Sequence, residues 1–152
     1  MSKLEKLCEA YEKFGLAIAT VPDDKAKALS SNSLGVRQFA SEARARIPKP
    51  TPSQIASGLE QGWRETLELI QCISVPWRTM ASQAWHNATL EVYPEFLAME
   101  RQRLDKVLER GKIRTEAEFY RIRHEVDVLE GRPESGVELQ RLYSLIDAYE
   151  VR

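Results

Sequence analysis

Apolar residues recur every three or four positions along most of the chain, with charged and polar residues between them. This spacing places apolar side chains on one face of an α-helix, whereas a half-buried strand would show strict alternation. Alternating apolar runs bounded by tight-turn residues are absent from the sequence. The pattern therefore predicts an all-α fold, namely a single-domain helical bundle of about six to eight helices that ends in a helical hairpin.

The best-defined pair of elements is this hairpin, over residues 111–150. Thr115 and Glu118 have the spacing of a capping box, which marks the start of a helix. Gly131 suits a left-handed helix end and Pro133 cannot continue a helix, so the first helix should end just before them. The second helix is indicated by apolar residues at spacings of three and four, namely Leu139, Leu142, Ile146 and Tyr149.

Two segments of the hairpin, I-R-T-E-A-E-F at 113–119 and L-Y-S-L-I-D-A-Y-E at 142–150, carry a resemblance to a known family. Together they resemble the N-terminal helical hairpin of HigA-type antitoxins, and the similarity covers about a quarter of the chain, over residues 113–150. In that family a helix-turn-helix DNA-binding domain follows the hairpin, and these 152 residues contain no counterpart of it. The resemblance implies a module of the kind found in toxin-neutralising proteins.

A proline-rich stretch divides the predicted bundle. Prolines at alternate positions from 48 to 52 favour extended backbone. We therefore expect residues 1–47 to form an N-terminal helical arm and residues 51–152 to form the main bundle of one domain. Thr51 and Gln54 flank a proline at a favoured helix-start position, which predicts a central helix. Its apolar stripe consists of Ile55, Leu59, Trp63, Leu67 and Ile70.

We expect this central helix to be the packing surface for its neighbours. Gly58 and Gly62 lie one turn apart on it and would let a neighbouring helix approach closely. The apolar residues of the hairpin should pack onto the same helix. These are Phe119, Ile122, Val126, Leu129, Leu142 and Ile146.

Aromatic residues gather in the middle third of the chain, at Trp63, Trp77, Trp85 and Tyr93. Such rings either fill a core, line a ligand pocket or anchor a partner. We favour the core interpretation, because the rings follow the helical spacing of the surrounding apolar residues.

Composition places further limits on function. The 152 residues, 43% of them hydrophobic, supply enough apolar surface for one core without a metal or disulfide. A formal net charge of −1 disfavours a general binder of nucleic acids or acidic membranes. We find no secretion signal and no apolar run near the ~18 residues of a membrane span, so we expect a soluble cytoplasmic protein without a membrane partner. Cys8 and Cys72 are interpreted as reduced, buried thiols.

Motifs for catalysis and for metal binding are absent from the sequence. Its histidines are His86 and His124. His124 begins a zincin-like segment, but Val128 stands where the second histidine is needed. The sequence therefore predicts a protein that is not an enzyme, with no catalytic residues, no metal ligands and no cofactor. Three acids near the tryptophans, Glu65, Glu68 and Glu91, are more typical of solvated charge than of an active site assembled from distant residues.

Charge is unevenly distributed along the chain. Residues 101–114 contain six basic and two acidic residues, a local net charge of +4. Such a strip can dock an acidic partner or phosphates, although cations also suit a helix C-terminus on their own. We call this set the basic strip; it comprises Arg101, Arg103, Lys106, Arg110, Lys112 and Arg114.

Two classes of function remain. The favoured class is a small non-enzymatic protein–protein interaction module, either an antitoxin-like or immunity-like neutraliser or an adaptor. Its unidentified protein partner would contact the basic strip and Tyr143. The alternative is a nucleic-acid-associated regulator that uses the strip from Arg101 to Arg114. Steep salt dependence would distinguish phosphate binding from an interface with an apolar centre. Self-association into a homodimer stays open.

Overall fold

The computed structural model describes residues 1–130 and 132–152, and in these residues it contains eight α-helices, one short 3-10 helix and no strand. The predicted all-α fold and helix number are confirmed. Gly131, expected to end a helix, lies outside the described residues. In that part of the chain no helix is both long and apolar enough to cross a membrane. The elements are α1 (Lys3–Ala17), α2 (Asp24–Leu34), α3 (Val36–Arg44), α4 (Pro52–Ile70), α5 (Val75–Val92), α6 (Pro94–Arg110), α7 (Glu116–Leu129), η1 (Pro133–Ser135) and α8 (Gly136–Glu150).

The chain forms two compact units, which we call unit 1 (Met1–Pro94) and unit 2 (Glu95–Arg152). This division replaces the one expected from the prolines, with an arm over 1–47 and a main bundle over 51–152. The physical reason is that α1 packs against α2, α4 and α5, so the N-terminal segment supplies the centre of unit 1. The proline-rich segment only connects α3 to α4.

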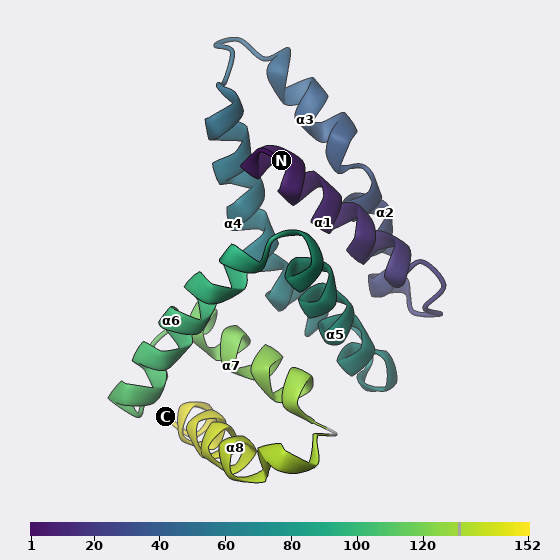
Figure 1. Ribbon diagram of the computed structural model, residues 1–152. Helices are drawn as coiled ribbons and strands as arrows, with labels where there is room; N and C mark the ends of the chain where they lie inside the picture. The colour runs from purple at the N-terminus through teal and green to yellow at the C-terminus, as the bar shows by residue number, and fades with distance from the viewer. Residues whose placement is uncertain (131) are drawn as a thin grey trace. The chain divides into compact units, whose positions relative to one another are not determined.

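The central helix of unit 1 is α1, and α4, which the sequence suggested for this role, is one of its neighbours. Figure 1 shows α1 running between α4 on one side and α2 and α3 on the other. Leu7, Ala10 and Phe14 on α1 are completely buried. An amphipathic stripe identifies the face that a helix buries, but it does not identify which helix has neighbours on most sides.

Tryptophans form the middle of the unit 1 core. The rings of Trp63 and Trp85 stack with centroids 5.3 Å apart. The Trp63 Nε1–H donates to the Thr89 hydroxyl at 3.0 Å, and the Trp85 Nε1–H donates to the Trp63 carbonyl at 3.2 Å. The core interpretation is confirmed for these two rings, while Trp77 is only half-buried.

Helix starts follow the predicted caps. At α4 the capping box is complete, because the Gln54 N–H donates to Thr51 Oγ1 at 3.1 Å and the Thr51 N–H donates to Gln54 Oε1 at 2.8 Å. At α7 the Thr115 hydroxyl accepts from the Glu118 N–H at 3.1 Å, but the Glu118 carboxylate accepts from the Arg114 N–H at 2.8 Å. Both local predictions are confirmed, the second with this altered partner.

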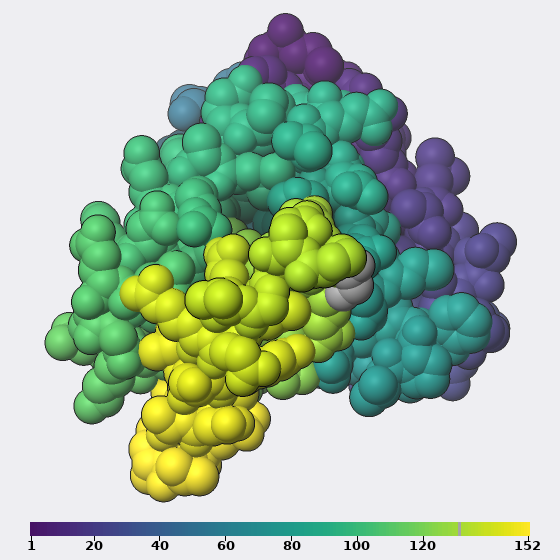
Figure 2. All heavy atoms as spheres, turned by 60° about the horizontal axis from the view of Figure 1, so that its bottom comes forward, coloured from purple at the N-terminus to yellow at the C-terminus, as the bar shows by residue number. Residues whose placement is uncertain are grey.

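Unit 2 has its own apolar core, made by α6, the hairpin helices and the turn between α6 and α7. The prediction that the hairpin packs on the helix over 51–73 is therefore corrected, because its apolar residues form one cluster with α6. The exposed surfaces of α6 and α8 are visible in Figure 2, in green and yellow. The buried cluster comprises Leu104, Val107, Leu108, Ile113, Ile122, Val126, Leu129, Leu142, Leu145, Ile146 and Tyr149, with Phe119, Leu139 and Tyr143 packed against it.

The two cysteines differ in their surroundings. Both are free thiols; Cys8 is buried on α1, as predicted, whereas Cys72 is exposed. The prediction fails at Cys72 because that position is about 200° around the helix from the buried Ile70, on the side of the exposed Leu69.

Candidate functional site

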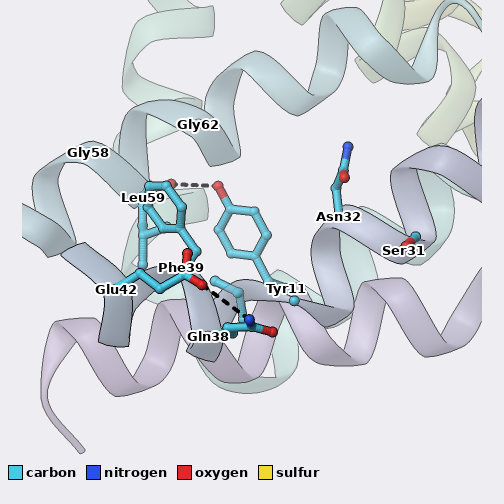
Figure 3. A pocket seen from close by; sticks show the side chains of 11 residues that line it. Tyr11, Ser31, Asn32, Gln38, Phe39, Glu42, Gly58, Leu59 and Gly62 are labelled. Carbon is cyan, nitrogen blue, oxygen red and sulfur yellow. Dashed lines mark hydrogen bonds between the residues drawn. The ribbon is translucent and has the colours of Figure 1, made fainter. Parts of the chain in front are cut away.

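Unit 1 contains a pocket of about 480 Å³ lined by residues of α1, α2, α3 and α4, which we call the α3–α4 groove. Figure 3 shows Tyr11 standing in its middle, with Glu42 on one side and Asn32 on the other. The volume lies within the ~300–1,000 Å³ typical of ligand sites. Besides these three residues, the lining includes Ser31, Gly35, Val36, Gln38, Phe39, Gly58, Leu59 and Gly62.

Tyr11 forms the floor of the groove and is held in place. Its hydroxyl donates to the Leu59 carbonyl at 2.8 Å, and its ring centroid lies 4.7 Å from that of Trp63. Burial, and to a smaller degree the charge of Glu65, raises the pKa of the Tyr11 phenol. The ring is therefore a fixed, neutral surface and does not serve as a proton donor or acceptor near neutral pH.

The two glycines of the α4 wall have different roles. A Cβ atom at Gly62 would lie 2.7 Å from the Tyr11 hydroxyl, so this glycine permits the close approach of α1 that the sequence predicts. A Cβ atom at Gly58 would meet nothing within 4 Å, so no neighbouring helix approaches there. The space beside Gly58 belongs to the groove.

The opposite wall presents an aromatic ring to solvent. The Phe39 side chain is 47% exposed, although its spacing in the sequence suggested a buried helix face. The Arg46 guanidinium lies 5.5 Å from the centre of that ring, within the range of a cation–π contact. Glu42 lies one turn after Phe39 on α3, and its carboxylate accepts a hydrogen bond from the Gln38 Nε2–H at 3.1 Å. Sequence periodicity could not identify this exposed ring, because Val36 and Ala40 share the buried face of α3.

Of two exposed carboxylates in this region, Glu42 lines the groove, and Glu65 lies outside the lining but near enough for its charge to act on Tyr11. Glu42 is part of the α3 wall. Glu65 follows Gly58 and Gly62 at positions i+7 and i+3, so the three residues share one face of α4. Glu65 accepts from the Gln61 amide at 3.1 Å and lies about 10 Å further along the helix axis than Gly58. The groove therefore has an apolar, aromatic middle and an acidic rim.

In unit 2, three cations of the basic strip are already paired within the chain. Arg101 contacts Asp105 at 3.0 Å, Glu138 at 3.5 Å and Glu125 at 3.7 Å. Because these partners come from α6, α7 and α8, Arg101 joins all three helices. Its charge is therefore balanced internally.

The other two paired cations of the strip are Arg103 and Arg110. Arg103 lies 3.7 Å from Glu100, and Arg110 pairs with Glu118 while its Nε–H donates to the Lys112 carbonyl at 3.0 Å. Arg110 thus fastens the turn between α6 and α7. Both residues have local structural partners before any ligand binds.

The remaining three cations, Lys106, Lys112 and Arg114, are exposed and form no ion pair within residues 1–130 and 132–152. Helix geometry also divides the strip: at about 100° per residue, Arg103 and Lys106 share one flank of α6, while Arg101 lies on the opposite flank. The strip is therefore not one continuous cationic surface.

Tyr143 is half-buried rather than free on the surface. It packs against the unit 2 core, and its hydroxyl donates to Glu130 at 3.0 Å. Burial and this hydrogen bond raise the pKa of the Tyr143 phenol. The residue links α8 to the end of α7, and its side chain is only partly accessible to a partner.

Sequence reasoning missed a buried charge network in unit 2. Arg121 lies 3.6 Å from Glu100 and 3.2 Å from Glu125, and all three side chains are largely buried. It is a structural tie between α6 and α7, because each carboxylate offsets the burial of the guanidinium. In the part of the chain that the structure describes, no group of three histidine, cysteine or acidic side chains could hold a metal ion.

Comparison with protein-family models, with curated proteins and with solved structures found no match for this chain. The resemblance of residues 113–150 to the hairpin of HigA-type antitoxins therefore stays a prediction. The geometry of the α3–α4 groove carries the functional argument.

Proposed function

We propose that this protein is a non-enzymatic module that binds another protein through the α3–α4 groove of unit 1. The observation that carries the proposal is the pocket of about 480 Å³ with a fixed Tyr11 floor and an exposed Phe39 wall. Exposed aromatic surface in a preformed hollow is typical of the centre of a protein interface, where one or two anchor side chains provide most of the affinity.

A neutraliser of the antitoxin or immunity type, or an adaptor, fits this proposal. The exposed cations Lys106, Lys112 and Arg114 would add a second, weaker contact surface, because exposed charges steer association more than they stabilise a complex. The alternative, a nucleic-acid-associated regulator, has less support. Arg101, Arg103 and Arg110 are already paired with carboxylates, and phosphate binding would require breaking those pairs.

Affinity capture from the native host tests the proposal when three forms of the full chain are compared. Gly58→Leu fills the groove from a position with open space, and the matched control Ser57→Leu adds the same side chain at the next exposed position of α4. We expect the wild type and Ser57→Leu to retain one protein partner that Gly58→Leu loses.

A second comparison separates the two surfaces. Lys106→Glu combined with Arg114→Glu should slow association but leave the same partner bound, because these cations belong to unit 2 and are not part of the groove lining. Capture of nucleic acid that collapses between ~50 and 200 mM salt, with no protein lost by Gly58→Leu, would contradict the proposal in favour of the alternative.

A further inference from the structure

We propose that the occupant of the α3–α4 groove is a basic amphipathic helix of the partner protein. An apolar side chain of this helix would rest on Tyr11 and Phe39, and lysine or arginine side chains beside it would pair with Glu42 and Glu65. The inference rests on the proposed function, since it names the chemistry of the protein that the groove binds.

The shape of the groove favours a helix over an extended strand. Its walls are the helices α3 and α4, and the described residues contain no strand whose edge could pair with an extended peptide. At Gly58 the α4 wall has no side chain, and a Cβ atom there would meet nothing within 4 Å. A partner helix can therefore approach the α4 backbone closely at this point.

The size of the groove sets how much of that helix it receives. A pocket of about 480 Å³ accommodates a few side chains rather than a whole helix. The natural fit is the apolar face of about two helical turns, with residues i, i+3 or i+4, and i+7 directed at the floor. The polar side chains of the partner helix would then lie over the rim.

Charge decides between a basic and an acidic helix. The exposed Glu42 lines the groove, and the exposed Glu65, outside the lining, is near enough for its charge to act on the Tyr11 hydroxyl on the floor. One cation near the groove, Arg46, already lies over the Phe39 ring. An acidic helix would therefore meet two like charges, whereas lysine or arginine at both ends of the apolar face would find a carboxylate.

Phe39 adds a second preference for cations. Its ring is 47% exposed and contacts the Arg46 guanidinium at 5.5 Å, so a cation–π contact already forms on this aromatic surface. The groove thus combines the two features that attract a cationic side chain with an apolar stem, an aromatic ring and a nearby carboxylate.

Isothermal titration calorimetry with the full chain and synthetic peptides tests this inference. The probe is an amphipathic peptide of about 14 residues with leucines at i, i+4 and i+7 and lysines beside them, and its matched control carries glutamate at every lysine position. We expect the lysine peptide to bind and the glutamate peptide to bind at least ~10-fold more weakly. Glu42→Gln and Glu65→Gln should each weaken binding of the lysine peptide by about two- to fivefold.

The variants separate failure of this inference from failure of the proposed function. Gly58→Leu should abolish binding of the lysine peptide, and Ser57→Leu should leave it unchanged. Equal or tighter binding of the glutamate peptide, still lost in Gly58→Leu, would overturn the basic occupant while the groove function stands. Binding unaffected by Gly58→Leu, or no binding together with no captured protein, would overturn both. A dimer of the free chain in sedimentation that Gly58→Leu abolishes would replace the partner helix by a second copy.

Discussion

Replacing Gly62 by alanine would place a methyl group 2.7 Å from the present position of the Tyr11 hydroxyl. That hydroxyl cannot retreat easily, because it donates to the Leu59 carbonyl at 2.8 Å and its ring lies against Trp63. The variant must therefore break the hydrogen bond or shift α1 from α4. At Gly58 the same substitution meets no atom within 4 Å. The two glycines form a matched pair on one helix.

The expected change in the free energy of unfolding has opposite signs for Gly58→Ala and Gly62→Ala. Glycine to alanine inside a helix stabilises a protein by about 0.5–1 kcal/mol, which is the full effect expected for Gly58→Ala. At Gly62 this gain is offset by a partly buried Tyr11 hydroxyl that loses its partner, which costs about 1–3 kcal/mol. We expect Gly62→Ala to lower the free energy of unfolding, and the two variants to differ by about 1–3 kcal/mol.

Urea unfolding followed by tryptophan emission measures this difference. All three tryptophans of the sequence lie in residues 1–94, so the signal reports unit 1. In a Tyr11→Phe background the hydroxyl is gone, and Gly62→Ala should then cost less than in the native background. The reasoning is refuted if Gly62→Ala stabilises the native chain as much as Gly58→Ala does, or if Tyr11→Phe leaves its effect unchanged.

Two further predictions concern buried charges. Burial raises the pKa of the Glu60 carboxyl, but hydrogen bonds from Tyr93 and Lys3 outweigh it and hold that pKa below its ordinary value of 4.5. A lowered pKa contributes stability that is present above pH 4.5 and lost as pH falls through the folded value, so Glu60→Gln should flatten the acid dependence of urea midpoints below pH 4.5. In unit 2, Arg121→Met should destabilise the fold by about 3 kcal/mol, because it removes the largely buried guanidinium that pairs with Glu100 and Glu125. Amide hydrogen exchange over residues 95–152 should become faster, and unchanged protection there would contradict this account.

Local signals carried most of the correct sequence predictions. Caps at Thr51 and Thr115 depend on hydrogen bonds within three residues, so their sequence spacing is sufficient to identify them. The stripe on α4 likewise identifies a buried face from its spacing alone. Which helices pack against one another could not be predicted from such local spacing. Periodicity indicates that Phe119 lies on an apolar face, but not that its ring stacks on Tyr149 of α8.

The groove and the basic strip show the same limit. Gly58 and Gly62 are equivalent in the sequence, and only the position of Tyr11 makes one of them a packing requirement and the other open space. Arg101 and Arg110 count as excess positive charge along the chain, but folding places carboxylates from α7 and α8 beside them. A count of charges along the sequence omits these long-range partners, so it overstates how much unpaired positive charge the strip presents to a ligand.

Because one thiol is exposed and the other is buried, the rates at which a reagent labels them report on opening of the fold. A thiol reagent reaches the exposed Cys72 in the folded state, whereas Cys8 is 3% exposed and lies on α1, with its pKa raised by burial. Attachment of the second label therefore requires α1 to separate from its neighbours. With excess reagent, the rate of Cys8 labelling would measure how often the centre of unit 1 opens. Mass spectrometry of singly and doubly labelled chains would give this rate without an added probe.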